Sequence, residues 1–267
     1  MDQGTHNSAL QLVDDLVAAG KSHFTFQEAQ RRTGRSSAAT GNLMRRMLDA
    51  GLIDRVRRGH YVVRPLGVLG TPSVAEEVAL AVGAAFADIP HRMGYRTALD
   101  EHDLIVHPAR SIQVATTRRI RAKALSGKPL YLVREPAPGI HIGAVRCGES
   151  WVSNVERALL DAAMRPGLVG GAAVLAEAVV TAGSKVDAAE LTRYAHELGW
   201  GSALRRVGSI ADALNVRGLV GQLEPLDQPT ADLDLEPGKN MPYEWRDKRW
   251  HIRWPHSVDE LASVTNQ

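Results

Sequence analysis

The 267-residue chain is longer than a single typical domain, so we expect about two domains, each with its own core. Hydrophobic residues make up 44% and charged residues 23%, a composition that excludes disordered and fibrous classes. The formal net charge is only +2 and identifies no partner by itself. The charge is unevenly distributed, because residues 1–67 hold ten Lys and Arg against six Asp and Glu, a local excess of +4.

A single cysteine, Cys147, excludes an internal disulfide and any multi-cysteine metal site. The first residues lack a charged leader followed by an apolar core, and no run approaches the roughly 18 apolar residues of a membrane span. We therefore expect a cytoplasmic protein with no membrane partner.

The residues give little support for catalysis. No glycine-rich nucleotide-binding motif occurs, and His102 and His107 lack the i, i+4 spacing of a helical metal pair. Cys147 could act as a nucleophile only with a histidine base nearby in space. We expect no cofactor, no metal and no catalytic residue.

Residues 24–63 have the pattern of a winged helix-turn-helix, preceded by an amphipathic helix at 8–19. Thr25 and Glu28 form a T-x-x-E capping box for one helix, which Gly34 ends. Ser36 or Ser37 can cap the next helix, which ends at Gly51. Two short alternating runs in 53–63, joined by a turn that contains glycine, predict a hairpin wing.

The second of these helices has the character of a recognition helix. Its apolar residues fall on one face, so Ala38, Gly41, Asn42, Arg45 and Arg46 project from the other. Small residues near the start allow close approach to base edges, and the guanidinium groups that follow reach phosphates or guanines. The predicted DNA-binding residues are Ser36, Ser37, Ala38, Asn42, Arg45, Arg46, Arg55, Arg57, Arg58 and His60. The alternative is a small helical bundle with a solvated arginine face.

Prolines and glycines at 65–72 predict a linker between a winged domain at 1–67 and a larger domain at 73–267. The second domain is predicted to combine a small sheet with a helical bundle, which makes the fold class α+β. Helices are expected at 73–87, 95–103, 153–165, 171–182, 187–198 and 202–214. Strands are expected at 104–106, 111–115, 130–133, 140–145 and 250–254.

Two further stretches have both a functional and a structural interpretation. Residues 104–134 contain no acid, and Arg118, Arg119, Arg121 and Lys123 form either a second basic surface or a charged sheet edge. The tryptophans of 250–254 either stack on unpaired bases or, as we favour, close a core edge.

Glu156 and Asp161 lie on the helix predicted at 153–165 and have two interpretations. They could hold a metal as a carboxylate pair. We favour the alternative, in which Glu156 completes an S-x-x-E capping box with Ser153 and Asp161 pairs with Arg157 at i, i+4.

Three segments together resemble the AbiEi family, the antitoxins and transcriptional repressors of type IV toxin-antitoxin systems. The first runs from Thr33-Gly34-Arg35-Ser36 to Arg58-Gly59-His60-Tyr61 and looks like the winged module of the family. The second is Tyr95-Arg96-Thr97-Ala98-Leu99, with Thr97 where Ser is more usual. The third, more distinctive, is the run 152–161 with Arg165-Pro166 and Gly170-Gly171 behind it.

The resemblance implies a cytoplasmic protein that is not an enzyme. Its N-terminal module would repress its own operon by binding double-stranded operator DNA, with self-association on repeated sites. Its C-terminal domain would counter a nucleotidyltransferase-like toxin without a stable complex. Two other functions stay open at this point. The second domain could be an enzyme that modifies the toxin or a nucleic acid, with Glu156, Asp161 and the stretch 118–123 lining one pocket, or a sensor that holds a small ligand.

Overall fold

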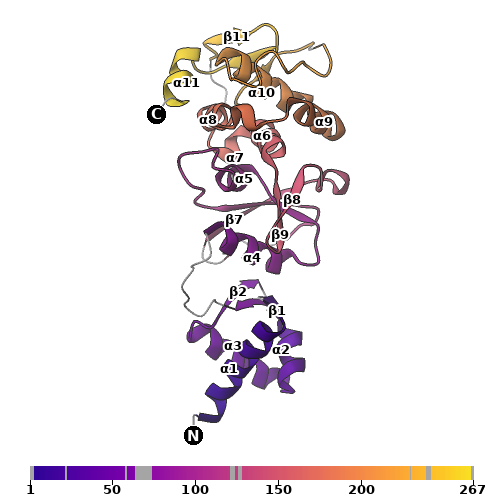
Figure 1. The fold of residues 1–267 in the computed structure, drawn as a ribbon, viewed down its shortest axis with the longest axis vertical. Helices are drawn as coiled ribbons and strands as arrows, with labels where there is room; N and C mark the ends of the chain where they lie inside the picture. Colours follow the sequence, from indigo (N-terminus) through magenta and orange to yellow (C-terminus); the bar gives the residue numbers. More distant parts are fainter. Residues whose placement is uncertain are drawn as a thin grey trace.

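The computed structural model describes residues 3–21, 23–57, 59–63, 74–120, 124–125, 128–228, 230–238 and 242–265. The fold is mixed α+β, as the sequence predicts. Figure 1 shows an elongated molecule, with helices and a small sheet at the N-terminal end, a larger sheet in the middle and a helical layer at the C-terminal end. Among the described residues, no helix is both long and apolar enough to cross a bilayer.

The N-terminal module, residues 3–63, has the element order of a winged helix-turn-helix. It contains α1 (Gln3–Ala18), β1 (His23–Thr25), α2 (Phe26–Thr33), α3 (Ser37–Asp49), β2 (Ile53–Arg57) and β3 (His60–Val63). The strands form an antiparallel sheet in the order β1-β3-β2. The helices and the wing hairpin were predicted, but β1 was not, and α1 begins five residues earlier than expected.

The helix ends of this module follow from local chemistry. The Thr25 hydroxyl accepts a hydrogen bond from the Glu28 amide at 3.1 Å, and Gly34 ends α2 in the left-handed conformation with φ 63°. Ser36, rather than Ser37, is the N-cap of α3, because its hydroxyl accepts from the Ala39 amide at 3.3 Å.

The hydrophobic core of the module is separate from that of the rest of the chain. Leu12 and Leu16 of α1 pack with Leu43 and Met47 of α3, all at most 2% exposed. The aromatic ring of Phe24 on β1 completes this cluster. Since α3 buries only one face here, its other face is left to solvent.

The middle of the molecule is a mixed sheet in the order β6-β7-β5-β4-β9-β8. Its elements are α4 (Val74–Phe86), β4 (His91–Met93), α5 (Tyr95–Glu101), β5 (Ile112–Thr116), β6 (Ala124–Leu125), β7 (Lys128–Arg134), η1 (Ala137–Gly139), β8 (Ala144–Cys147) and β9 (Ser150–Ser153). The strand expected at 104–106 is absent, and most of the strand expected at 140–145 is turn, with β8 starting only at Ala144. Leu104 and Ile140 of these stretches are nevertheless buried, at most 1% exposed, whereas Val106 is 73% exposed.

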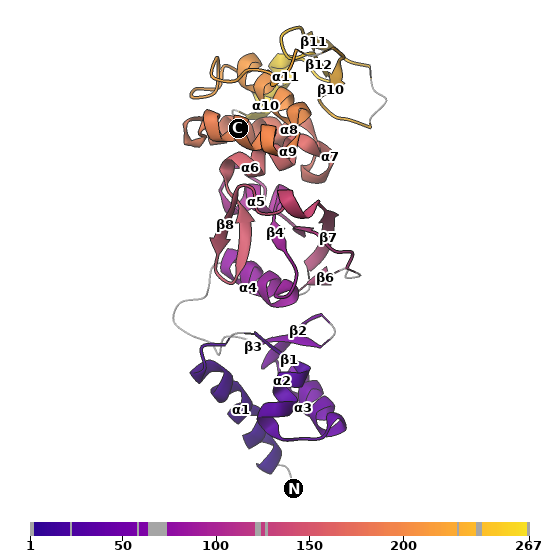
Figure 2. The same ribbon diagram turned by 90° about the vertical axis from the view of Figure 1, so that its right-hand side faces the viewer.

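Helices cover the far end of this sheet, as Figure 2 shows. They are α6 (Val155–Met164), α7 (Pro166–Val169), α8 (Ala172–Ala182), η2 (Gly183–Lys185), α9 (Ala188–Leu198) and α10 (Gly201–Ala213). Pro166 ends α6 as predicted but also starts α7, because a proline at the first helical position loses no intrahelical hydrogen bond.

The C-terminal residues form β10 (Leu233–Asp234), β11 (Trp245–Asp247), β12 (Ile252–Trp254) and α11 (Val258–Thr265). Trp250 and Trp254 have no exposed surface and pack against α10, so this strand closes a core edge, and these rings are not accessible for stacking on bases. The core-edge interpretation is therefore confirmed, but the strand is shorter than predicted, because Trp250 lies in the turn before β12.

Helix α4 lies between the N-terminal module and the large sheet, and it contacts β1, β2 and β3. Val62 of β3 belongs to the hydrophobic cluster of the second region, and His23 of β1 pairs with Glu149 in the β8–β9 turn at 2.6 Å. The linker predicted at 65–72, and with it the proposed domain boundary, lies outside the described residues.

Candidate nucleic-acid interface

The face of α3 opposite the core is the first candidate surface. Ser36, Ser37 and Ala38 are exposed at its N-terminal end, and Asn42, Arg45 and Arg46 are exposed along the next two turns. Gly41 lies among them, and a Cβ at this position would meet no atom within 4 Å. The exposed face thus carries small side chains at its start and positively charged side chains farther on, as expected from the residue spacing.

Asn42 is the centre of a local polar cluster on this face. Its side-chain oxygen accepts a hydrogen bond from the Arg45 guanidinium at 3.3 Å, and its backbone carbonyl accepts one from the Arg46 Nε at 3.3 Å. These two contacts hold both guanidinium groups close to Asn42. An Asn amide can form two hydrogen bonds with adenine and Arg can form two with guanine, so the cluster presents both base-reading chemistries together.

The arginines of this face lack the acidic partners that some other exposed arginines of the chain have. Arg193 pairs with Glu190 and Glu197, and Arg249 pairs with Asp212 and Glu224. Within the described part of the chain, Arg45, Arg46 and Arg55 form no ion pair with an acidic group. Their charge is therefore available to an anionic partner.

The wing supplies the second group of predicted residues. Arg55 is exposed on β2, the pairing with β3 shifts between Arg55 and Arg57, and Gly59 turns the hairpin with φ 81°. His60 is half-buried at the start of β3. The Arg57 side chain and the whole of Arg58 lie outside the described residues, so their predicted roles stay predictions.

A groove runs beside the wing and ends at the second region of the molecule. It is lined by Thr25, Phe26 and Gln27 at the start of α2, by Arg55, Gly59, His60 and Tyr61 of the wing, and by Asp88, which follows α4. At the start of α2 the Phe26 amide donates to the Gly59 carbonyl oxygen at 2.8 Å and the Glu28 amide donates to the Thr25 hydroxyl, so both are satisfied within the protein.

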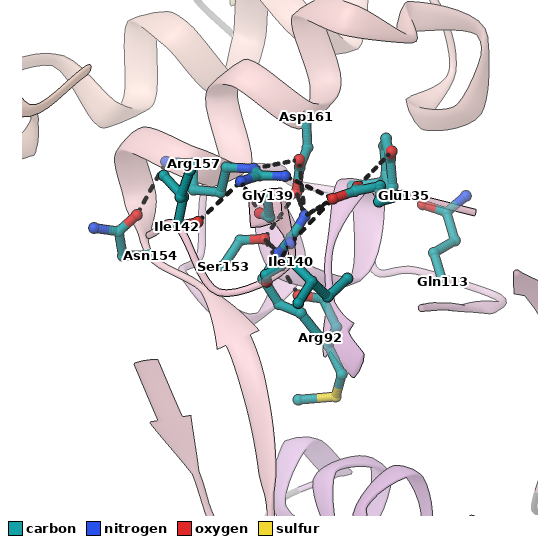
Figure 3. A network of polar contacts seen from close by, with 12 residues as sticks. Arg92, Gln113, Glu135, Gly139, Ile140, Ile142, Ser153, Asn154, Arg157 and Asp161 are labelled. Carbon is teal, nitrogen blue, oxygen red and sulfur yellow. Dashed lines mark hydrogen bonds and ion pairs between the residues drawn. The ribbon is translucent and has the colours of Figure 1, made fainter. Parts of the chain in front are cut away.

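A buried polar network lies on the far side of α4, where β4 and β9 meet α6 (Figure 3). The Arg92 guanidinium donates to Asp161 at 3.0 Å and to Glu135 at 3.2 Å. Arg157 donates to Glu135 at 2.7 Å and to Asp161 at 2.8 Å. The Ser153 hydroxyl accepts from Arg92 at 2.7 Å and donates to Asp161 at 2.8 Å. Two positive and two negative side chains, each at most 5% exposed, therefore neutralise one another.

The electrostatics of this network follow from burial and pairing. Burial alone would raise the pKa of the Asp161 carboxyl, but Arg92 and Arg157 outweigh it and hold the pKa below its ordinary value. For Arg92, burial would lower the pKa, but Asp161 and Glu135 raise it above the ordinary value. Both groups are thus held in their charged forms, which suits a cross-link between strands and helix rather than proton transfer.

The whole fold is similar to that in the "Crystal structure of RV2827C protein from Mycobacterium tuberculosis". The match has a TM-score of 0.69 and 15% sequence identity, and it covers 98% of this chain and 95% of that chain. At this identity the likeness shows a shared fold only. No protein-family model and no curated protein sequence matches the chain.

The side chains of Glu156 and Asp161, the two carboxylates predicted on α6, have different partners in the structure. Asp161 points into the buried network, where it pairs with Arg157 as expected. Glu156 does not cap its own helix: Asn154 is the N-cap, and Glu156 accepts a hydrogen bond from the Asp187 amide at 3.0 Å. The predicted S-x-x-E capping box is therefore wrong, because the Ser153 hydroxyl forms hydrogen bonds within the buried network instead. The two carboxylates do not form a shared pocket.

Other candidate residues are also used internally. His102 Nε2 contacts the Ser153 carbonyl oxygen at 2.6 Å, and the Cys147 thiol donates to Glu101 at 3.5 Å. No group of three or more His, Cys, Asp or Glu suited to a metal ion occurs among the described residues.

The residues of the Tyr95–Leu99 segment anchor α5. The Tyr95 hydroxyl donates to Glu135 at 3.0 Å, and the Thr97 hydroxyl accepts from the Gln113 amide at 2.8 Å. Arg92 and Glu135 were not identified from the sequence. No local pattern marks them, because their side-chain partners lie 22 to 69 positions away.

The second basic surface is only partly described. Arg118 and Arg119 are exposed directly after β5, and neither forms an ion pair within the described residues. Arg121 and Lys123 lie outside those residues.

Proposed function

We propose that the protein is a DNA-binding antitoxin that represses its own toxin-antitoxin operon. The observation that carries the repressor half is the exposed cluster of Asn42, Arg45 and Arg46 on α3, in which neither arginine forms an ion pair with a described acidic residue. The cluster lies next to a wing with Arg55 and His60. In this proposal α3 enters the major groove of operator DNA, Asn42 and Arg45 read bases, and the wing arginines hold phosphates.

The antitoxin half rests on the resemblance of the three sequence segments to the AbiEi family. In this proposal the second region counters a nucleotidyltransferase-like toxin by binding or self-association rather than by catalysis, in the cytoplasm. The buried network of Arg92, Glu135, Arg157 and Asp161 then acts as a scaffold that fixes the position of α6.

A reporter experiment tests the repressor half. The DNA upstream of the gene drives the reporter, and the parent protein, the Asn42→Ala/Arg45→Ala variant and a Lys185→Ala/Arg217→Ala control are supplied separately. Lys185 and Arg217 are exposed in the C-terminal region, so the control removes positive charge far from α3. We expect repression by the parent and the control and its loss with the first variant. Equal reporter output with all three proteins would contradict the proposal.

A growth experiment tests the antitoxin half. A nucleotidyltransferase-like reading frame adjacent to the gene is expressed with and without the protein. We expect growth arrest that the protein relieves, and relief by the Asn42→Ala/Arg45→Ala variant too, because this variant leaves the second region intact. Absence of such a reading frame, or arrest that persists with the parent protein, would refute this half.

A further inference from the structure

A single line of exposed side chains runs along α3 opposite the face that the core covers. With about 3.6 residues per turn, residues three and four positions apart fall on this line. Its members are Ala38, Asn42, Arg45 and Asp49, all of them exposed. Asp49 is an acid at the C-terminal end of the helix and would repel phosphates, so the part of the line that suits DNA runs from Ala38 to Arg45.

Asn42 and Arg45 form one unit on this line. The Arg45 guanidinium donates to the Asn42 side-chain oxygen at 3.3 Å, so the polar ends of the two side chains lie in contact. Neighbouring bases of a DNA strand are also about 3.4 Å apart. The helix rises about 4.5 Å over three residues, which is likewise close to one base step. The side-chain contact and the backbone spacing therefore both match adjacent base pairs rather than pairs two steps apart.

The hydrogen bond between these side chains is compatible with base reading by both. An amide oxygen can accept two hydrogen bonds, so Asn42 can accept from the amino group of adenine, and donate to adenine N7, while it still accepts from Arg45. A guanidinium has several N–H donors, and two directed at O6 and N7 of guanine leave others for Asn42. The pair can therefore persist on DNA, with each side chain holding the other in its reading orientation.

Arg46 is placed differently, although it is the next residue along the chain. It lies to one side of the line, and its Nε donates to the backbone carbonyl oxygen of Asn42 at 3.3 Å. Its guanidinium is thus held to the helix backbone rather than to the Asn42 amide. A cation at the flank of a recognition helix suits the phosphates that border the groove. Arg46 therefore offers a matched control of the same charge, one position away from Arg45.

We propose that Asn42 and Arg45 read an adenine and a guanine on adjacent base pairs of the operator, as one hydrogen-bonded unit. This inference rests on the proposed DNA-binding function and specifies which bases that function recognises. The two readings are interdependent, because loss of either side chain removes the group that orients the other. Arg46 holds a phosphate beside them and contributes affinity without sequence preference.

Selection from a duplex library tests the adjacency. A library with about 20 random base pairs, roughly two helical turns, is selected with the parent, Asn42→Ala, Arg45→Ala and Arg46→Ala, and the bound duplexes are sequenced. We expect the parent to enrich sequences in which adenine and guanine occupy adjacent base pairs. Asn42→Ala should lose chiefly the preference for adenine, and Arg45→Ala chiefly the preference for guanine. Arg46→Ala should enrich the parental sequence.

Fluorescence anisotropy on the enriched duplex measures the size of these effects. Replacing the A·T pair or the G·C pair should weaken binding by the parent about 5- to 150-fold. Arg46→Ala should weaken binding to every duplex and lower the slope of log K against log salt by about 0.9. The fold-losses of Asn42→Ala and Arg45→Ala, multiplied together, should exceed the fold-loss of the double variant at least about twofold, because the two side chains orient each other.

Asn42→Asp keeps the shape of the side chain and changes what it can read. A carboxylate cannot donate to adenine N7, but it can accept from the N4 amino group of cytosine. We expect this variant to change the enriched base at that position from adenine to cytosine. The neighbouring guanine should be kept, because a carboxylate still accepts from the Arg45 guanidinium.

Three results would overturn the inference. The base pairs sensitive to Asn42→Ala and Arg45→Ala could be separated by one or more others, the enriched bases could differ from adenine and guanine, or the fold-losses could simply multiply to that of the double variant. Retention of adenine by Asn42→Asp would also count against it. All of these differ from failure of the proposed function, in which the parent enriches no sequence from the library.

Discussion

Replacing Arg157 by Met removes one of the two cations of the buried network while keeping an unbranched apolar side chain of similar length. The Arg157 side chain is 0% exposed. Its guanidinium donates to Glu135 and Asp161 and, at 2.9 Å each, to the backbone carbonyls of Gly139 and Ile142. It also lies over the Trp200 ring, with 4.6 Å between the guanidinium carbon and the ring centroid.

The expected loss of stability is large because Arg92 alone cannot neutralise two carboxylates. Removing one partner of a buried ion pair costs about 3 to 5 kcal/mol, since it leaves a buried charge without compensation. That is a substantial part of the roughly 5 to 15 kcal/mol by which a domain is usually stable. The variant should therefore fold at 25 °C but unfold at a clearly lower urea concentration.

The assay is urea unfolding followed by circular dichroism, with Arg193→Met as the matched control. Arg193 also forms two short ion pairs, both 2.6 Å, but it is half exposed, so solvent already screens its charge. We expect the control to unfold at the parental midpoint. A parental midpoint for Arg157→Met, or equal losses in both variants, would refute the argument from burial.

The pH dependence of the stability of the parent protein and of Arg157→Met provides a second check. In the parent, the depressed pKa of Asp161 contributes stability that is present above its unfolded value near 4 and is lost as the pH falls toward the folded pKa. In Arg157→Met the loss of a cation raises the pKa of the carboxyl, so protonation relieves the buried charge. The stability difference between the two proteins should therefore narrow as the pH falls from 7 to 4. A constant difference would contradict this account of the network.

Two further predictions concern stability at single positions, and both are measured by urea unfolding. Gly208→Ala should cost about 1 to 3 kcal/mol or more, because its Cβ would lie 2.2 Å from Cζ2 of the buried Trp250; Gly167→Ala, with no atom within 4 Å, should cost much less. Ser36→Ala should cost about 1 kcal/mol through loss of the α3 cap, whereas Ser37→Ala, one residue farther on, should change stability by less than about 0.5 kcal/mol. Equal losses within either pair would contradict the assigned contacts.

The N-terminal module was predictable because its signals are local. Thr25, Gly34 and Ser36 act within four residues of their positions, and the spacing of Leu43 and Met47 alone determines which face of α3 is buried. The exposure of Asn42 and Arg45 follows directly from that spacing. Strand β1 escaped prediction because three residues carry no periodicity, and its pairing with β3 spans more than thirty positions.

The buried network was not predictable for the opposite reason. Its contacts, except those of Asp161 with Arg157 and Ser153, join residues far apart in the sequence, and nothing near Arg92 or Glu135 marks a partner. The capping-box error has the same origin. The sequence pattern favours Ser153 as the N-cap. Its hydroxyl is hydrogen-bonded to Asp161 and Arg92 instead, and the neighbouring Asn154 caps the helix.

The most direct test of sequence-specific DNA binding compares two affinities of the Asn42→Ala/Arg45→Ala variant. One is for the duplex upstream of the gene, the upstream duplex, and the other is for a duplex of equal length and shuffled sequence, the shuffled duplex. Each lost base contact should weaken binding to the upstream duplex by about 1 to 3 kcal/mol, while binding to the shuffled duplex, which depends on phosphates, should change far less. Equal weakening on both duplexes, or a parent protein that binds both equally, would contradict the assignment of α3 as the recognition helix.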